Sequence, residues 1–176
     1  MKGCRLEVTS GAALLYPLLY FLDDSGALAA VLPAVIVHEL GHFIAAAFCG
    51  IKVRAIRLEI TGLCMETDRI EDTRRELFCL AAGPAAGFFW AGLVWIMNGT
   101  LLSRSVLAAL IVNGFNLLPA LPLDGGRILQ LVSQSYKAAC ISTALCAVLF
   151  LFFAVRWRMW PCLLPVALFG RELLIA

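Results

Sequence analysis

Residues 31–48, VLPAVIVHELGHFIAAAF, contain both histidines of this 176-residue chain. His38 and His42 are four positions apart, so on an α-helix they lie on one face, one turn apart. Two imidazoles placed in this way can hold one zinc ion, and Glu39 between them can act as base on the water molecule that the metal activates. Because the flanking residues are apolar, the stretch predicts a metal site within a membrane-spanning helix.

The composition indicates an integral membrane protein. Hydrophobic residues make up 62% of the chain and charged residues 15%, and the mean hydropathy is +0.92. Soluble domains have about 45–50% apolar and about 25% charged residues, so this chain has too little polar surface to cover a globule in water. The net charge of +2 predicts no nucleic-acid partner. The seven cysteines form no CxxC pair and are expected to be buried apolar side chains.

Apolar segments recur along the chain and predict an all-α membrane protein of about six transmembrane helices. These segments cover residues 11–22, 27–49, 77–97, 105–123, 138–155 and 157–175. The first is short enough to suit a signal peptide as well, but we favour an uncleaved helix. Residues 51–67 alternate apolar and polar side chains around Gly62, which predicts a small membrane-associated β-hairpin. Residues 68–76 are expected to form a charged loop.

The basic residues predict the orientation of the chain in the membrane. With the N-terminus inside, eleven of the fourteen Lys and Arg residues lie on inner segments, as the positive-inside rule requires. Both termini are then cytoplasmic, and His42 and Asp124 lie near the cytoplasmic ends of their segments. We therefore expect a multi-pass protein of a bacterial cell membrane, with its active site toward the cytoplasmic side.

A catalytic zinc ion needs a third protein ligand and one open coordination position. Besides Glu39 we single out Asp124, a carboxylate preceded by a long apolar stretch. An ionisable group there is costly unless it is paired or binds a metal. Residues 119–126 contain two prolines and two glycines, so we expect no regular helix there but an irregular backbone that lines a polar cavity.

The stretch from Asn116 to Gly125, NLLPALPLDG, resembles the NxxPxxPxDG signature of the site-2 protease family of intramembrane zinc metalloproteases. The HELGH stretch, the predicted hairpin, the Ala82-Gly83-Pro84 element and the six-segment layout are similar to that family as well. Among its branches, the chain looks most like the sporulation enzyme that processes a pro-sigma factor.

The resemblance implies one zinc ion per chain, with His38, His42 and Asp124 as ligands and Glu39 as general base. It also implies a protein substrate cleaved in or near a membrane segment, with release of a transcription or sigma factor as one outcome. The sporulation enzyme carries a C-terminal nucleotide-sensing CBS domain, and many relatives carry a PDZ domain. Because this chain ends at Ala176, we expect a single metalloprotease core over residues 1–176 with neither domain.

Several roles stay open at this level. Asn116 can donate a hydrogen bond to the scissile carbonyl or the developing oxyanion, or it can satisfy backbone groups near the prolines. The hairpin tip, Ile60, Thr61 and Gly62, can contact an extended substrate strand, or the hairpin can anchor the chain at the membrane surface. Asn113 is expected to be structural. Gly83-Pro84 is expected to be a kink or a helix start.

Other classes of protein could use the same residues. A non-hydrolytic metal-binding or transport protein would have little use for Glu39 beside the ligands. A catalytically silent, partner-binding relative would be expected to have lost a ligand or the base. An unrelated membrane zinc protease acting on prenylated or small peptides would give no reason for Asp124 in its motif. The intramembrane zinc endopeptidase is therefore the favoured hypothesis, and regulators and oligomeric state are not predicted.

Overall fold

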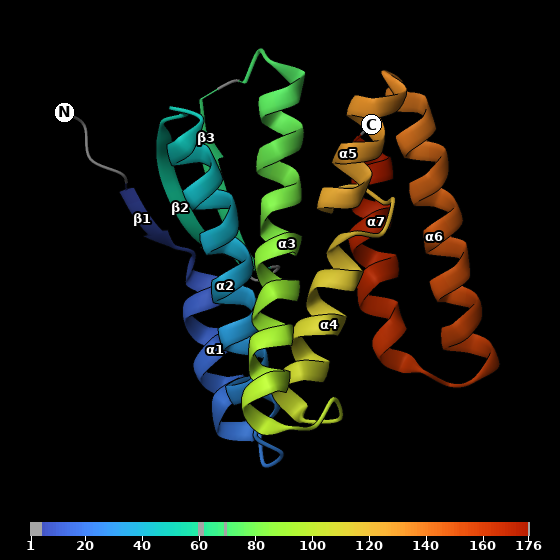
Figure 1. The fold of residues 1–176 in the computed structure, drawn as a ribbon. Helices are drawn as coiled ribbons and strands as arrows, with labels where there is room; N and C mark the ends of the chain where they lie inside the picture. The colour runs from blue at the N-terminus through green and yellow to red at the C-terminus, as the bar shows by residue number, and fades with distance from the viewer. Residues whose placement is uncertain (1–4, 60–61, 69, 176) are drawn as a thin grey trace. The chain divides into compact units, whose positions relative to one another are not determined.

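The computed structural model describes residues 5–59, 62–68 and 70–175. The chain divides into two compact units, Met1–Asn113 and Gly114–Ala176. Helices make up most of both units, and the described strands form one small sheet in the first unit (Figure 1). The predicted helical class is therefore confirmed, with a sheet larger than the expected hairpin.

Among the described residues, four helices belong wholly or mainly to the first unit. They are α1 (Ser10–Leu22), α2 (Ala27–Phe48), α3 (Thr73–Asn98) and α4 (Arg104–Asn116). Asp23 begins α2, because its carboxylate accepts hydrogen bonds from the backbone N–H groups of Ala27 (3.1 Å) and Leu28 (2.7 Å). Asp72 caps α3 by accepting from the N–H of Arg74 at 2.9 Å. This cap starts α3 one turn earlier than predicted, so part of the expected charged loop is helical.

Helices α2 and α3 pack closely through small residues. A Cβ atom on Gly41 would lie 2.5 Å from the carbonyl oxygen of Ala82, so only glycine permits this approach. Small side chains line the contact elsewhere too, and α4 adds two residues to the same core: Ala34, Ala91, Val94, Val106 and Ala109. Small residues let helix backbones approach in a membrane, where water exclusion between helices does not drive association.

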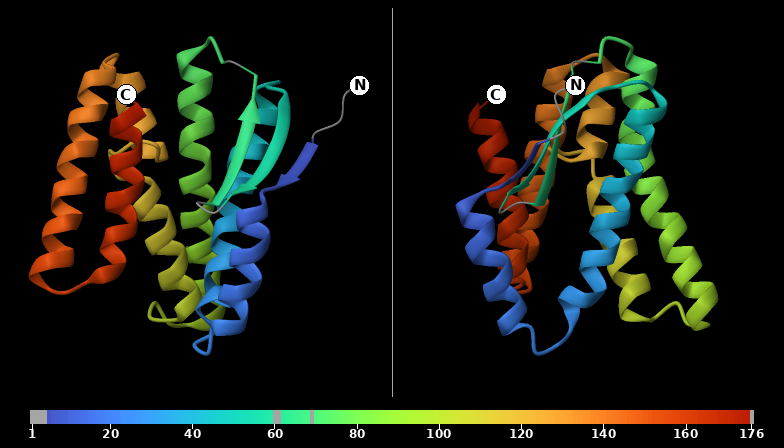
Figure 2. Two further views of the ribbon diagram at one scale, coloured as in Figure 1. Left: turned by 180° about the vertical axis from the view of Figure 1, so that it is seen from behind. Right: turned by 90° about the vertical axis from the view of Figure 1, so that its left-hand side faces the viewer.

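The sheet contains the predicted hairpin and one strand that was not predicted. Strands β2 (Val53–Glu59) and β3 (Gly62–Thr67) are antiparallel, and β1 (Arg5–Val8) pairs in parallel with β2. The sheet lies beside the C-terminal half of α2 (Figures 1 and 2). Val53 and Met65 pack there against the buried pair Ala45 and Ala46. The predicted tip residues Ile60 and Thr61 lie outside the described residues.

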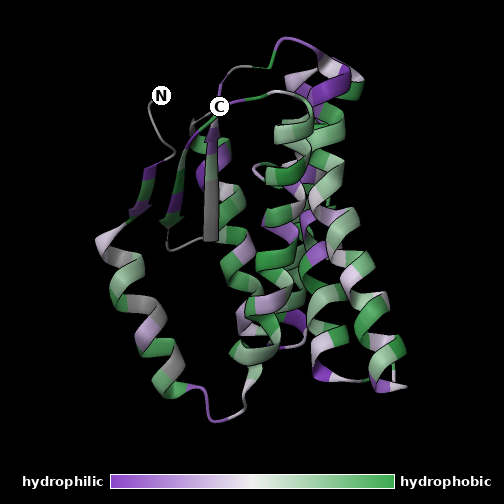
Figure 3. Cartoon of the chain, turned by 60° about the vertical axis from the view of Figure 1, so that its left-hand side comes forward, coloured by the Kyte–Doolittle hydropathy of each residue, from purple (hydrophilic) through white to green (hydrophobic). Residues whose placement is uncertain are grey.

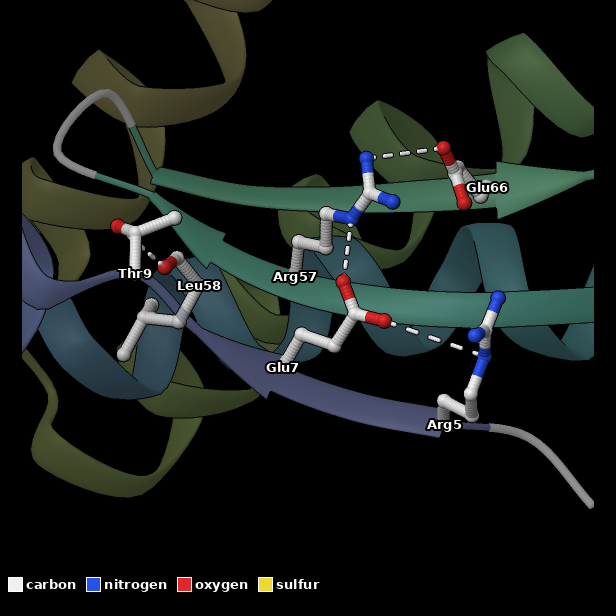
Figure 4. Close-up of polar contacts among 6 residues, drawn as sticks. All are labelled: Arg5, Glu7, Thr9, Arg57, Leu58 and Glu66. Carbon is white, nitrogen blue, oxygen red and sulfur yellow. Dashed lines mark hydrogen bonds and ion pairs between the residues drawn. The ribbon is translucent and has the colours of Figure 1, made fainter.

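Arg57 joins the three described strands through its guanidinium group (Figure 4). Its Nε donates to Glu7 Oε2 on β1 at 2.7 Å, and its Nη1 lies 2.9 Å from Glu66 Oε1 on β3. Where β1 leads into α1, the Thr9 hydroxyl donates to the carbonyl oxygen of Leu58 at 3.1 Å. These polar contacts attach the N-terminal strand to the hairpin.

The second unit contains α5 (Asp124–Ser133), α6 (Tyr136–Arg156), the 3-10 helix η1 (Trp160–Cys162) and α7 (Leu163–Ile175). Helices α6 and α7 run antiparallel on either side of η1 (Figure 1). The rings of Phe115, Phe150 and Phe169 pack together with centroids 6.0–6.3 Å apart. They form the core of this unit.

The proline- and glycine-rich stretch is irregular only up to Leu123. There the Thr143 hydroxyl accepts from the backbone N–H of Leu121 at 2.8 Å. From Asp124 onward the chain is helical, so the expectation of an irregular backbone over 119–126 is wrong for its last three residues. Gly125 and Gly126 allow this, because a Cβ on either would overlap the backbone of the preceding irregular segment.

Three described helices, α2, α3 and α6, are long and apolar enough to cross a membrane by length and composition. Helices α1, α4 and α7 have 13 residues each, fewer than the roughly 20 that a span needs. The predicted fourth segment, residues 105–123, yields a helix that already ends at Asn116. Apolar residues predominate on the helices, whereas hydrophilic residues gather in connections, at helix ends and on the strands (Figure 3).

We predict that acid loosens β1. The hydrogen bond from Arg57 holds the pKa of the Glu7 carboxyl below its usual value. A lowered folded-state pKa stabilises the strand above the unfolded pKa of about 4.3, and this contribution disappears as the pH falls through the folded value. Hydrogen exchange of β1 amides, corrected for intrinsic rates, should therefore accelerate on acidification.

The Glu7→Gln variant is the matched control. It should show weaker β1 protection at neutral pH and a smaller acid effect, because position 7 no longer titrates. Identical acid dependence in wild type and variant would contradict a role for the Glu7–Arg57 pair.

Candidate metal centre

Helix α2 presents the histidines on its buried face. His38 is 3% exposed and His42 is 9% exposed, whereas Glu39, one position further around the helix, is half-buried. The imidazole centroids lie 4.7 Å apart at an interplanar angle of 83°. The two Nε2 atoms are 3.1 Å apart. The predicted one-turn spacing thus brings the Nε2 atoms of the two rings close enough to share one ligand.

The opposite nitrogen of His42 is held by α3. Its Nδ1 lies 2.8 Å from the backbone carbonyl oxygen of Cys79. Because a carbonyl oxygen only accepts, the hydrogen bond requires a proton on Nδ1. In the neutral ring, Nε2 then carries the lone pair.

The opposite nitrogen of His38 is held by α4. Its Nδ1 lies 2.8 Å from Oδ1 of Asn113. The Asn113 amide donates through Nδ2 to the carbonyl oxygen of Ala109 at 2.7 Å. That bond sets which end of the amide faces His38, since Nδ2 must point toward the Ala109 carbonyl. The oxygen therefore accepts from His38, whose Nε2 also carries a lone pair.

This arrangement fits a cation. Two neutral imidazoles that both carry their proton on Nδ1 bring two acceptors to 3.1 Å of each other at Nε2. Two acceptors repel unless a positive charge lies between them. Zinc–nitrogen bonds of about 2.0–2.1 Å at a roughly tetrahedral angle place two nitrogens about 3.3 Å apart. The donor chemistry and spacing of the histidines therefore suit zinc.

Two glycines of α3 make room for this arrangement. A Cβ on Gly83 would overlap the His42 imidazole, and a Cβ on Gly87 would overlap the Asn113 amide. Gly83-Pro84 therefore does not start a helix, as one reading of the sequence expected, because both residues lie inside α3. The missing side chain at Gly83 is what allows α3 to approach the histidine.

The other predicted residues occupy several elements. Asp124 is half-buried in the first turn of α5, and Asn116 is the half-buried last residue of α4. Gly62 begins β3.

The sequence prediction missed the polar role of Asn113, although an amide in an apolar helix was an available signal. It also missed the contact between the Cys79 carbonyl and His42. The sequence carries no signal for this contact, because every residue has a backbone carbonyl.

Comparison with known proteins identifies the family. Residues 12–121 match the family described as Peptidase M50B-like. The chain is 36% identical over 137 residues to a zinc metalloprotease of Methanocaldococcus jannaschii, across 68% of this chain and 40% of that protein. It thus spans about 40% of the length of this curated relative.

The fold is similar to a solved structure as well. The site-2 protease from Methanocaldococcus jannaschii superposes with a TM-score of 0.73 and 27% identity, covering 98% of this chain and 92% of that chain. The chain belongs to the M50B-like peptidase family and has the site-2 protease fold of a multi-pass membrane protein. The family predicted from the two motifs is confirmed.

We predict that Gly83→Ala damages the metal centre. The added methyl group overlaps the His42 ring. Overpacking of this kind costs about 1–3 kcal/mol, and displacement of the ring should weaken zinc binding about tenfold or more. Thermal unfolding and chelator competition on the purified protein measure the two effects.

Gly92→Ala is the matched control, because it makes the same substitution on the same helix where a Cβ meets nothing within 4 Å. It should leave zinc affinity unchanged and add up to about 1 kcal/mol of helix stability. Equal zinc affinities for both variants would contradict the steric argument.

Proposed function

We propose that this protein is an intramembrane zinc endopeptidase that cleaves a peptide bond in or near a membrane segment of a protein substrate. The observation that carries the proposal is the pair of imidazole Nε2 atoms at 3.1 Å, each oriented by an oxygen acceptor on its Nδ1. Family membership supports it, because the curated relative described above is a zinc metalloprotease. Glu39 supplies a carboxylate directly beside the first histidine.

We assign one zinc ion per chain to His38, His42 and Asp124. Each of the three offers a ligand atom of a type that zinc accepts. Residues 1–176 are proposed to act as a single metalloprotease core. When bound, zinc polarises the scissile carbonyl and acidifies a water molecule.

Glu39 is the proposed general base and acid. It accepts a proton from the attacking water as the new C–O bond forms, and it then returns that proton to the amine nitrogen as the peptide C–N bond breaks. Asn116 is proposed to donate its amide N–H to the developing oxyanion. A helical substrate must unwind first, because its peptide groups are bonded internally. Ile60, Thr61 and Gly62 are proposed to contact the extended form.

We further propose that all six apolar segments lie in the membrane, with both termini and the active site on the cytoplasmic side of a bacterial cell membrane. The distribution of basic residues supports this orientation. The short helices also expose large apolar side chains, among them Phe21 in α1, Ile111 in α4 and Leu164 in α7. Lipid is the natural partner for such side chains.

The substrate proposed from the sequence resemblance is a membrane-associated protein whose cleavage releases or activates a transcription or sigma factor, as in the sporulation branch. The two motifs support the protease chemistry of this proposal. A candidate membrane-associated pro-sigma factor is therefore the first substrate to test.

We predict that Glu39→Gln abolishes hydrolysis and keeps zinc. The amide cannot accept the water proton, so cleavage of a membrane peptide in detergent should fall about 10²–10⁴-fold. Zinc content should match that of wild type, since His38 and His42 are unchanged. Glu71→Gln, a substitution of an exposed carboxylate, should cleave normally. Full activity of Glu39→Gln would overturn the mechanism, and a zinc-loaded wild type without cleavage would favour a non-hydrolytic metal-binding protein.

Asp124→Ala tests the third ligand. Removal of the carboxylate should weaken zinc affinity by more than about 100-fold, since even outer-shell partners contribute 10–100-fold. Asp68→Ala is the control, because Asp68 pairs with Arg54 near the sheet and has no proposed role at the metal. Unchanged zinc affinity in the Asp124 variant would exclude this residue as a ligand.

A further inference from the structure

We propose that Asn113 is the positioning residue of the metal centre, holding His38 in the tautomer and orientation that bind zinc, and that Gly87 exists to admit its side chain. The inference rests on the proposed zinc function. It assigns a role to a residue that carries no metal ligand atom and lies outside both sequence motifs.

Asn113 is fully buried in an apolar environment. It is 0% exposed, and the core of α2, α3 and α4 beside it is built from alanine and valine side chains. A buried amide without hydrogen bonds costs roughly 1–3 kcal/mol by mutational measures. Simple packing would therefore favour leucine or alanine here. The amide must be explained by the groups that it contacts.

The two ends of the amide perform different tasks. Nδ2 donates to the carbonyl oxygen of Ala109, one turn earlier on α4, at 2.7 Å. This bond fixes the rotation of the amide and directs Oδ1 toward His38 Nδ1, at 2.8 Å. A hydrogen bond to the far nitrogen of a ligating histidine orients the ring and raises its basicity. Helix α4 thus provides the oxygen acceptor for the Nδ1–H of His38, as the Cys79 carbonyl does for His42.

The glycines of α3 match this arrangement residue by residue. Gly83 leaves room for the His42 ring, and Gly87, one turn further, leaves room for the Asn113 amide that holds His38. The four-residue spacing of the glycines therefore repeats the four-residue spacing of the histidines. Room for the His42 ring at Gly83 and for the Asn113 amide at Gly87 explains why α3 lacks a side chain at both positions.

The test measures zinc affinity of the purified full chain in detergent by chelator competition, together with thermal unfolding. Asn113→Leu keeps a similar volume and removes the acceptor, so zinc affinity should fall about 10–100-fold. Asn113→Asp restores an acceptor oxygen and should recover most of that loss. Val106→Ala is the packing control, because Val106 is buried in the same helix without a polar contact to His38. It should lower thermal stability and leave zinc affinity unchanged.

Gly87 provides an independent arm. Gly87→Ala alone should weaken zinc binding, because the new methyl group displaces the Asn113 amide. In an Asn113→Ala background, the same substitution should cause no further loss, since no amide is left to displace. This arm, with Asn113→Asp, decides the question if Asn113→Leu does not fold.

Unchanged zinc affinity in Asn113→Leu or in Gly87→Ala would overturn the inference, as would an equal loss from Gly87→Ala in both backgrounds. If Asp124→Ala loses zinc while Asn113→Leu keeps it, the proposed function stands and only the role of Asn113 fails. If the wild-type chain binds no zinc, the proposed function itself fails.

Discussion

The histidine pair sets the main constraint on the first unit. The Nε2 atoms of His38 and His42 lie 3.1 Å apart among packed apolar helices. Each ring donates from Nδ1 to a carbonyl-type oxygen, one on the backbone of α3 and one on the Asn113 side chain of α4. Both lone pairs are thereby directed to one point. Two lone pairs this close repel each other unless a cation lies between them, and the contacts that direct them come from three helices, α2, α3 and α4. The geometry of the metal centre therefore depends on how α2, α3 and α4 pack together.

Small residues allow these helices to pack closely enough. At Gly41, Gly83 and Gly87 a single methyl group would overlap either the neighbouring helix or a residue of the metal centre. Helices in a membrane gain little from excluding water, so close backbone contact and interhelical hydrogen bonds stabilise their association. The same glycines that bring α3 close to α2 therefore also place its Cys79 carbonyl within hydrogen-bond distance of a histidine.

Local patterns predicted the parts of the fold that depend on nearby residues. The boundaries of α2 agree within one residue with the predicted 27–49 segment, because Asp23 and the apolar run define them. Strand β1 was not predicted, since four residues pair with a strand some fifty positions away. The helical start at Asp124 was also missed. Proline and glycine disfavour helices locally, and only contact with the preceding turn shows why two glycines are accommodated there.

The sequence by itself determined the helical membrane class, the family and the pairing of His38 with His42, because hydropathy and four-residue spacing act along one helix. The tertiary structure alone decided which nitrogen of each ring faces the metal. That choice depends on Asn113 and on the Cys79 carbonyl. The first lies 75 positions from its histidine and the second is a backbone group that every residue carries. No local pattern can therefore report either contact, and only the packing of α3 and α4 against α2 creates them.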